Sequence, residues 1–200
     1  FKGFLVKDEP SGEEIEVYAA DKELYEERFP NSLYYINLLP NYATTSQLSN
    51  LTYEEYVDKY LTMVKPEFIS YDFYPLRYSG TKSYILQGYL ANCEIMAVKA
   101  KEHGIPVWGF FQSMGYGDKR APDEQDFRFQ AYVNLAYGVK GMQHFCYWTP
   151  MTNDGGKFNE TTTAMISRTG EKTERYYYAQ TINNEMLSFD HVFLNFTWET

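Results

Sequence analysis

The chain has 200 residues, 44% of them hydrophobic, which is enough for one globular domain with a sizeable core. Its formal net charge is −9 and it contains no run of Lys or Arg. That charge excludes the basic surface expected of a protein that binds nucleic acid or anionic lipid, and it fits neutral or cationic partners better. No stretch approaches the roughly 20 apolar residues that cross a bilayer, so membrane insertion is not expected.

Short apolar segments alternate with longer segments of helical period, in the βαβα order that builds a parallel sheet. The short segments do not alternate cleanly between apolar and polar residues, as is typical of strands buried on both faces. Strands are predicted at about Gly3–Lys7, Leu33–Asn37, Glu67–Asp72, Pro106–Gln112 and Met142–Tyr147. Helices are predicted at about Gly12–Arg28, Tyr53–Val64, Tyr84–Glu102, Asp123–Tyr137 and Lys172–Leu187.

Two of these helices begin with the sequence pattern of a capping box. Ser11 is followed three residues later by Glu14, and Thr52 is followed in the same way by Glu55. In this motif each side chain binds the backbone N–H of the other residue, so it predicts a helix start at both places.

Five strands are too few to close an eight-stranded barrel. The chain is therefore an open α/β sheet or a part of a barrel. No GxGxxG or GxxxxGK[ST] motif follows any strand, so the usual nucleotide-binding reason for an open doubly wound sheet is missing. We expect an α/β protein of the (β/α)₈ TIM barrel class, in which residues 1–200 form the C-terminal part of one catalytic barrel. They supply about the last five βα units, and the N-terminal units are absent from this chain.

In such a barrel the active site forms at the C-terminal ends of the strands. Glu9 follows the first strand, and Pro10 after it favours an extended conformation that leaves the carboxyl at the strand end. The polar and aromatic residues that follow the other four strands are Asn37, Asn41, Asp72, Tyr74, Gln112 and Trp148.

These segments resemble a known family. Lys7-Asp8-Glu9-Pro10 is similar to the Asn-Glu-Pro signature that closes the fourth strand of clan A glycoside hydrolases, and Val107 through Trp148 is similar to the seventh and eighth units of β-galactosidase-like members. The second likeness includes a Gln-Ser pair at 112–113, an Ala-Tyr-Gly-Val-Lys-Gly turn at 136–141 and an aromatic strand ending in tryptophan.

The resemblance implies a TIM barrel that hydrolyses O-glycosidic bonds of a carbohydrate without a cofactor. It implies that Glu9 is the general acid/base, that galactosides are the first substrates to test, and that Trp148 stacks on the sugar. Asn37, Asn41, Tyr74 and Gln112 would bind the sugar beside it.

One departure from the family concerns the second carboxylate. Clan A enzymes place a nucleophilic glutamate at the end of the seventh strand, and here that stretch reads Trp108-Gly-Phe-Phe-Gln-Ser113. Asp72 and Glu124 are the available substitutes. A retaining enzyme holds its two carboxyl groups about 5–5.5 Å apart and an inverting one about 6.5–9.5 Å apart, so the choice leaves the mechanism open.

Each of these residues also has a structural interpretation. Glu9 is then an exposed loop carboxylate, Asp72 a hydrogen-bond acceptor, and Gln112 a partner for buried polar groups. Glu124, with Arg128 at i+4, has the pattern of an ordinary stabilised helix start, and Trp148 is then a core residue. The three histidines, His103, His144 and His191, match no metal-ligand spacing, and a structural role is expected for them.

Three other functions remain open at this point. The missing seventh-strand glutamate favours a catalytically inactive, carbohydrate-binding relative. A metal-assisted hydrolase or a lyase would need a ligand set that the sequence does not display. In the third interpretation, residues 1–200 have no activity of their own, because half a barrel lacks the residues of its first three units. The sequence fixes neither the oligomeric state nor the cellular location, although secretion or a periplasmic location is compatible with it.

Overall fold

The computed structural model describes residues 2–199 and has an α/β fold. The elements of its main sheet and their flanking helices agree in type with most of the predicted segments. In chain order the elements are β1 (Gly3–Asp8), α1 (Glu14–Arg28), β2 (Leu33–Leu38), α2 (Tyr53–Val64), β3 (Ile69–Tyr71), β4 (Leu76–Ser79), β5 (Lys82–Ile85), α3 (Tyr89–His103), β6 (Val107–Gln112), α4 (Glu124–Ala136), β7 (Gly141–Phe145), α5 (Glu174–Leu187) and α6 (Asp190–Asn195).

The five-stranded sheet has the order β1-β2-β3-β6-β7. The β1–β2 and β2–β3 pairs are parallel. The strands of this sheet are arranged in the order in which they occur along the chain, with β4 and β5 forming a separate sheet. A doubly wound sheet instead reverses its strand order at a switch point. The topology is therefore compatible with part of a TIM barrel.

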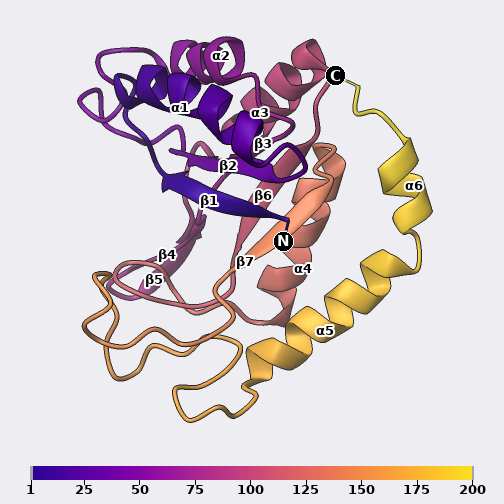
Figure 1. The fold of residues 1–200 in the computed structure, drawn as a ribbon. Helices are drawn as coiled ribbons and strands as arrows, with labels where there is room; N and C mark the ends of the chain where they lie inside the picture. Colours follow the sequence, from indigo (N-terminus) through magenta and orange to yellow (C-terminus); the bar gives the residue numbers. More distant parts are fainter. Residues whose placement is uncertain (1, 200) are drawn as a thin grey trace. The chain divides into compact units, whose positions relative to one another are not determined.

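The chain divides into two compact units. The first comprises the described residues up to Asp72 together with residues 91–108. In it, α1 and α2 lie side by side over β1 and β2 (Figure 1). Tyr34 and Ile36 of β2 and Tyr56 and Tyr60 of α2 are almost fully buried. The apolar face of α2 and the strands thus form the core of this unit.

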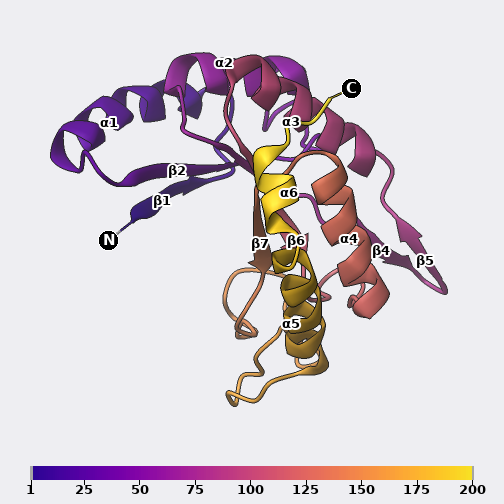
Figure 2. The same cartoon turned by 90° about the vertical axis from the view of Figure 1, so that its right-hand side faces the viewer.

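The second unit comprises residues 73–90 and the described residues from 109 onward. Within it, α4 and α5 lie side by side (Figure 2). Its core contains Phe111 of β6, Phe127 and Ala131 of α4, and Ile182 of α5. Arg128 of α4 also binds both carboxylate oxygens of Glu185 on α5, at 2.7 Å each.

The prediction of a helix over Tyr84–Glu102 is wrong at its beginning. Residues Lys82–Ile85 form β5, which pairs antiparallel with β4, and α3 begins only at Tyr89. Lys82 and Tyr84 are exposed. A two-stranded hairpin with little buried surface leaves no strong alternation in the sequence, and neither this hairpin nor the short helix α6 is among the predicted elements.

The Thr52–Glu55 capping box is confirmed. The Thr52 hydroxyl accepts from the Glu55 N–H, and the Glu55 carboxylate accepts from the Thr52 N–H. Ser11 and Glu14 make the corresponding pair of hydrogen bonds, although α1 begins two residues later than predicted, at Glu14. Among residues 2–199, no helix is both long and apolar enough to span a membrane.

Candidate active site

The parallel register of the first unit brings three polar residues into line. Asp8 at the end of β1 lies opposite Asn37 of β2, and Asn37 lies opposite Ser70 of β3. Asp72 follows Ser70 by two residues. Because residues two apart in an extended chain point to the same face, this register places the Asp72 side chain near Asn37.

Asn37 is the centre of the resulting hydrogen-bond network. Its amide Nδ2 donates to Asp8 Oδ1 at 3.1 Å and to Asp72 Oδ1 at 2.8 Å. Its carbonyl Oδ1 accepts from Ser70 Oγ at 2.9 Å. The residue is buried, and both amide hydrogens have a partner. Asn37 therefore joins two carboxylates in this structure.

Asp72 is the buried carboxyl of the network, with only 7% of its surface exposed. Its pKa is raised to about 7, first by burial and next by the nearby charge of Glu9, while the hydrogen bond from Asn37 acts in the opposite direction. Asp72 makes no ion pair in the described part of the chain. A carboxyl that titrates near neutrality is suited to acid/base chemistry.

Glu9 lies at the end of β1, exposed to solvent. The expectation that Pro10 holds it extended is wrong, because its φ is +50°. Its backbone N–H donates to the Asn37 carbonyl at 2.9 Å, so the turn is fixed to β2 at this point. A left-handed conformation costs a residue other than glycine on the order of 1 kcal/mol or more, and such strain is concentrated at functional sites.

Asn41 belongs to the loop after β2 and is half-buried. Its backbone N–H donates to the side-chain oxygen of Asn92 on α3, at 2.7 Å. The same loop is held at Leu39, whose carbonyl accepts from the Tyr53 hydroxyl at 2.8 Å. The loop that carries Asn41 is thus attached to the body of the first unit.

The other predicted site residues lie in the second unit. Gln112 is fully buried at the end of β6. Its side-chain oxygen accepts from the Leu76 N–H, and its amide donates to the carbonyls of Leu76 and Arg120. Most of its hydrogen-bonding capacity is used by backbone, which favours the structural interpretation of this residue.

Two aromatic residues of the predicted site differ in exposure. Tyr74 is buried, with its ring 5.4 Å from Phe145 and 6.2 Å from Tyr116 between centroids. Trp148 is 49% exposed, and its backbone forms a parallel bridge with Ile166. Of the two, only Trp148 offers a large solvent-accessible ring surface.

Glu124 is the first residue of α4, directly after the cap residue Asp123. Arg128, four residues on, binds Glu185 rather than Glu124. Glu124 is part of a helix start, and Asp126, not Glu124, completes the capping box with Asp123. The predicted carboxylates that share one unit are therefore Glu9 and Asp72.

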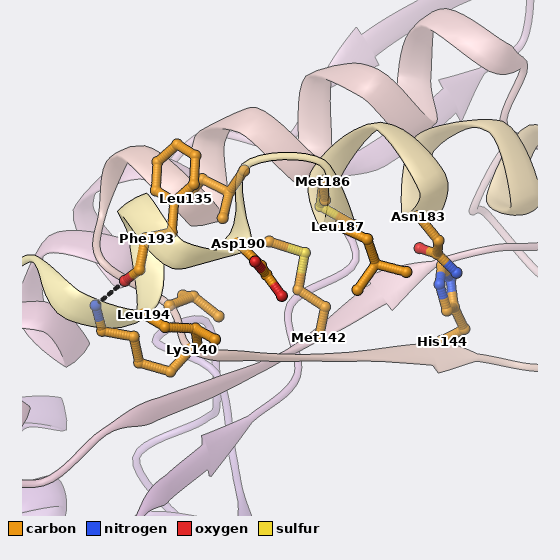
Figure 3. Close-up of a pocket in the computed structure, with 11 residues that line it drawn as sticks. Leu135, Lys140, Met142, His144, Asn183, Met186, Leu187, Asp190, Phe193 and Leu194 are labelled. Atoms are coloured by element: carbon orange, nitrogen blue, oxygen red, sulfur yellow. Dashed lines mark hydrogen bonds between the residues drawn. The ribbon is translucent and has the colours of Figure 1, made fainter.

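The second unit also contains a pocket of about 420 Å³ between β7, α5 and α6 (Figure 3). Its walls are largely apolar, and none of the predicted site residues lines it. His144 and Asn183 lie together at one end (Figure 3). Ser113 Oγ is 2.8 Å from His144 Nδ1, and burial lowers the pKa of His144 to about 4. His144 is therefore uncharged at neutral pH.

Two residues of the network, Asp8 and Ser70, were missed by sequence analysis. Asp8 had a visible signal, because it precedes Glu9 in the Lys-Asp-Glu-Pro segment. Ser70 had a weaker one, its spacing of two from Asp72 in a strand. Within residues 2–199 no group of three or more His, Cys, Asp or Glu side chains is arranged to hold a metal ion.

Comparison with known proteins finds a structure with a similar fold but no matching family. No protein-family model and no curated protein matches the chain. Among solved structures it is similar to a candidate alpha-L-fucosidase from Bacteroides thetaiotaomicron VPI-5482, with a TM-score of 0.51 and 10% identity over 72% of this chain. The chain spans 48% of that protein, about half its length. At this identity the likeness shows a shared fold, and the neighbour is by name a glycoside hydrolase.

Proposed function

We propose that the protein is a glycoside hydrolase that cleaves O-glycosidic bonds of a carbohydrate, with Glu9 and Asp72 as its paired carboxylates. The observation that carries the proposal is the network around Asn37, in which Asp72 is buried with a pKa near neutrality and senses the charge of Glu9. Two carboxyl groups in contrasting environments are what glycoside hydrolysis requires.

Two likenesses support this assignment. The Lys-Asp-Glu-Pro segment and the segment from Val107 to Trp148 resemble clan A, β-galactosidase-like enzymes, and the structural neighbour is named as a fucosidase. We infer that further βα units complete the barrel in the whole protein, because five strands do not close one. Asn41, in the same unit as the two carboxyl groups, is the residue we propose to contact the sugar, since the Asn37 side chain is engaged by Asp8, Asp72 and Ser70.

A carbohydrate-binding relative without activity is the second candidate. It is favoured by one observation, the absence of a carboxylate in the β6 segment Val107–Gln112, where Gln112 is bound to backbone. Sugar binding without turnover by the full-length protein would establish it.

The test is hydrolysis of a panel of aryl glycosides, including β-galactosides and α-L-fucosides, by the full-length protein and its variants. We expect turnover of at least one aryl glycoside by the parent and, on the methyl glycoside of the same sugar, a loss of about 10²-fold or more in both Glu9→Gln and Asp72→Asn. Glu124→Gln is the matched control and should keep more than a third of the parent rate. Absence of turnover on the whole panel, or full activity of Asp72→Asn on the methyl glycoside, would refute the proposal.

A further inference from the structure

We propose that Asp72, rather than Glu9, donates the proton to the departing glycosidic oxygen, and that Asn37 is the positioning residue that orients the Asp72 carboxyl. The inference rests on the proposed function and assigns the roles within the pair. It reverses the assignment that the family resemblance implies.

The first step of the argument is the contrast in burial between the two carboxyl groups. Asp72 is 7% exposed, whereas Glu9 lies at the surface at the end of β1. Water stabilises the charged form of an exposed carboxylate, and its absence favours the protonated form of a buried one. The proton is therefore held at the buried position.

The second step is the set of groups that face Asp72. Asp8 and Glu9, at the end of β1, are negative and disfavour a charge on Asp72. Tyr53 and Tyr56, from α2, are buried, and burial raises the pKa of both hydroxyls, so they are neutral. Asn37, from β2, supplies the 2.8 Å hydrogen bond. The two carboxylates at the end of β1 thus add to the effect of burial, and the hydrogen bond from Asn37 opposes it.

The third step is the geometry of Asn37. Its Nδ2 holds Asp72 Oδ1, and its Oδ1 is fixed by Ser70 Oγ. Ser70 Oγ lies in turn 3.0 Å from the Tyr35 hydroxyl. Asn37 thus cannot rotate its amide without losing bonds to β1, β3 and Asp72 together. The hydrogen bond to Oδ1 therefore fixes the orientation of the Asp72 carboxyl.

In the cleavage step the Asp72 O–H bond breaks and the proton bonds to the departing oxygen. The bond between that oxygen and the anomeric carbon breaks at the same time, and its electron pair stays with the oxygen, which leaves as an alcohol. A water oxygen bonds to the anomeric carbon, and the Glu9 carboxylate accepts the proton of that water. Proton exchange with solvent restores the acid form of Asp72 and the charged form of Glu9.

Leaving-group dependence tests the division of roles. A dinitrophenyl group departs without protonation, whereas an alkyl alcohol needs a proton. In the full-length protein, Asp72→Asn should keep kcat/KM within about 10-fold on a dinitrophenyl glycoside and lose about 10²- to 10⁴-fold on the methyl glycoside of the same sugar. Glu9→Gln should lose the same factor on both substrates.

The possible outcomes separate the two proposals. If Glu9→Gln is the variant whose loss depends on the leaving group, the role assigned to Asp72 is refuted while the proposed function stands. If the parent turns over no glycoside, both fail together.

A pH profile tests the positioning role of Asn37. The alkaline limb of kcat/KM should lie near pH 7 in the parent, and Asn37→Ala should move it upward because ionised Asp72 loses its hydrogen bond. Asn37→Ser is the second variant, should the alanine variant not fold, and the same shift is expected. Thr52→Ala, which removes the cap of α2, controls for lost stability and should leave the limb in place. An unmoved limb in the Asn37 variants would overturn the positioning role.

Discussion

At the scale of single residues, Asp72 links the chemistry of the site to the stability of the fold. Its pKa in the folded protein is about 7, against an ordinary value of 3.8. The folded state therefore binds this proton more tightly than the unfolded state does. The stabilisation of the folded state by this proton is fully present below pH 3.8 and is lost as the pH rises through 7.

Asp72→Asn should accordingly flatten the pH dependence of stability. Between pH 4 and pH 8 the parent should lose up to ~4 kcal/mol of unfolding free energy that the variant does not lose, from the pKa difference of about three units. Urea unfolding of the full-length protein at a series of pH values measures this. Glu23→Gln, which removes an exposed charge of α1, is the control. An Asp72→Asn variant with the slope of the parent would contradict the buried, protonated carboxyl.

The role of Asn37 shows why residue-level function was only partly predictable. Its position after a strand indicated a site residue, and it does lie among the candidate carboxylates. The two hydrogen bonds depend on the parallel register of β1, β2 and β3, which no local pattern encodes. For the same reason the left-handed φ of Glu9 could not be predicted, since Pro10 alone favours an extended chain.

At the scale of elements, Gln112 connects β6 to its neighbours in the second unit. Its amide binds the N–H and the carbonyl of Leu76 at the start of β4, and the carbonyl of Arg120. The Gln130 side chain binds the backbone of Gln112 in turn. These bonds fix the end of β6.

Gln112→Leu should therefore lower stability and leave substrate affinity unchanged. Because it leaves buried backbone groups without partners, we expect a loss of about 3 kcal/mol in unfolding free energy. Gln125→Leu, on the exposed side of α4, should cost less than ~0.5 kcal/mol. Thermal unfolding and KM, measured for the parent and both variants, distinguish a structural role of Gln112 from a role in sugar binding. A raised KM with unchanged stability would show instead that Gln112 binds the sugar.

The elements that the sequence predicted well share a physical cause. Strands buried on both faces and helices with a capping box carry strong local signals, as at Leu33–Leu38 and at Thr52. The hairpin of β4 and β5 carries none, because most of β5 is exposed and its pairing is local to two short strands. The helical period of α3 therefore wrongly predicts a helix over residues 84–88 as well.

At the scale of the whole molecule, strand order is the most informative feature. The order β1-β2-β3-β6-β7 follows the chain, so the ends of β1, β2 and β3 carry their polar residues to neighbouring positions. This explains how Asp8, Asn37 and Asp72, separated by up to 64 positions in the sequence, form one network. The chain spans about half of its structural neighbour, and we propose that the whole protein forms the complete sugar site.

The most direct test of the account is a double-mutant comparison in the full-length protein, using kcat/KM on the methyl glycoside of the sugar that it hydrolyses fastest. Residues that act as one catalytic unit lose activity in a strongly non-additive way. Glu9→Gln and Asp72→Asn should each lose about 10²-fold or more, and the double variant should fall little below the weaker single variant. If the loss in the double variant equals the product of the two single losses, or if either single variant keeps the parent rate, Glu9 and Asp72 do not form a catalytic pair.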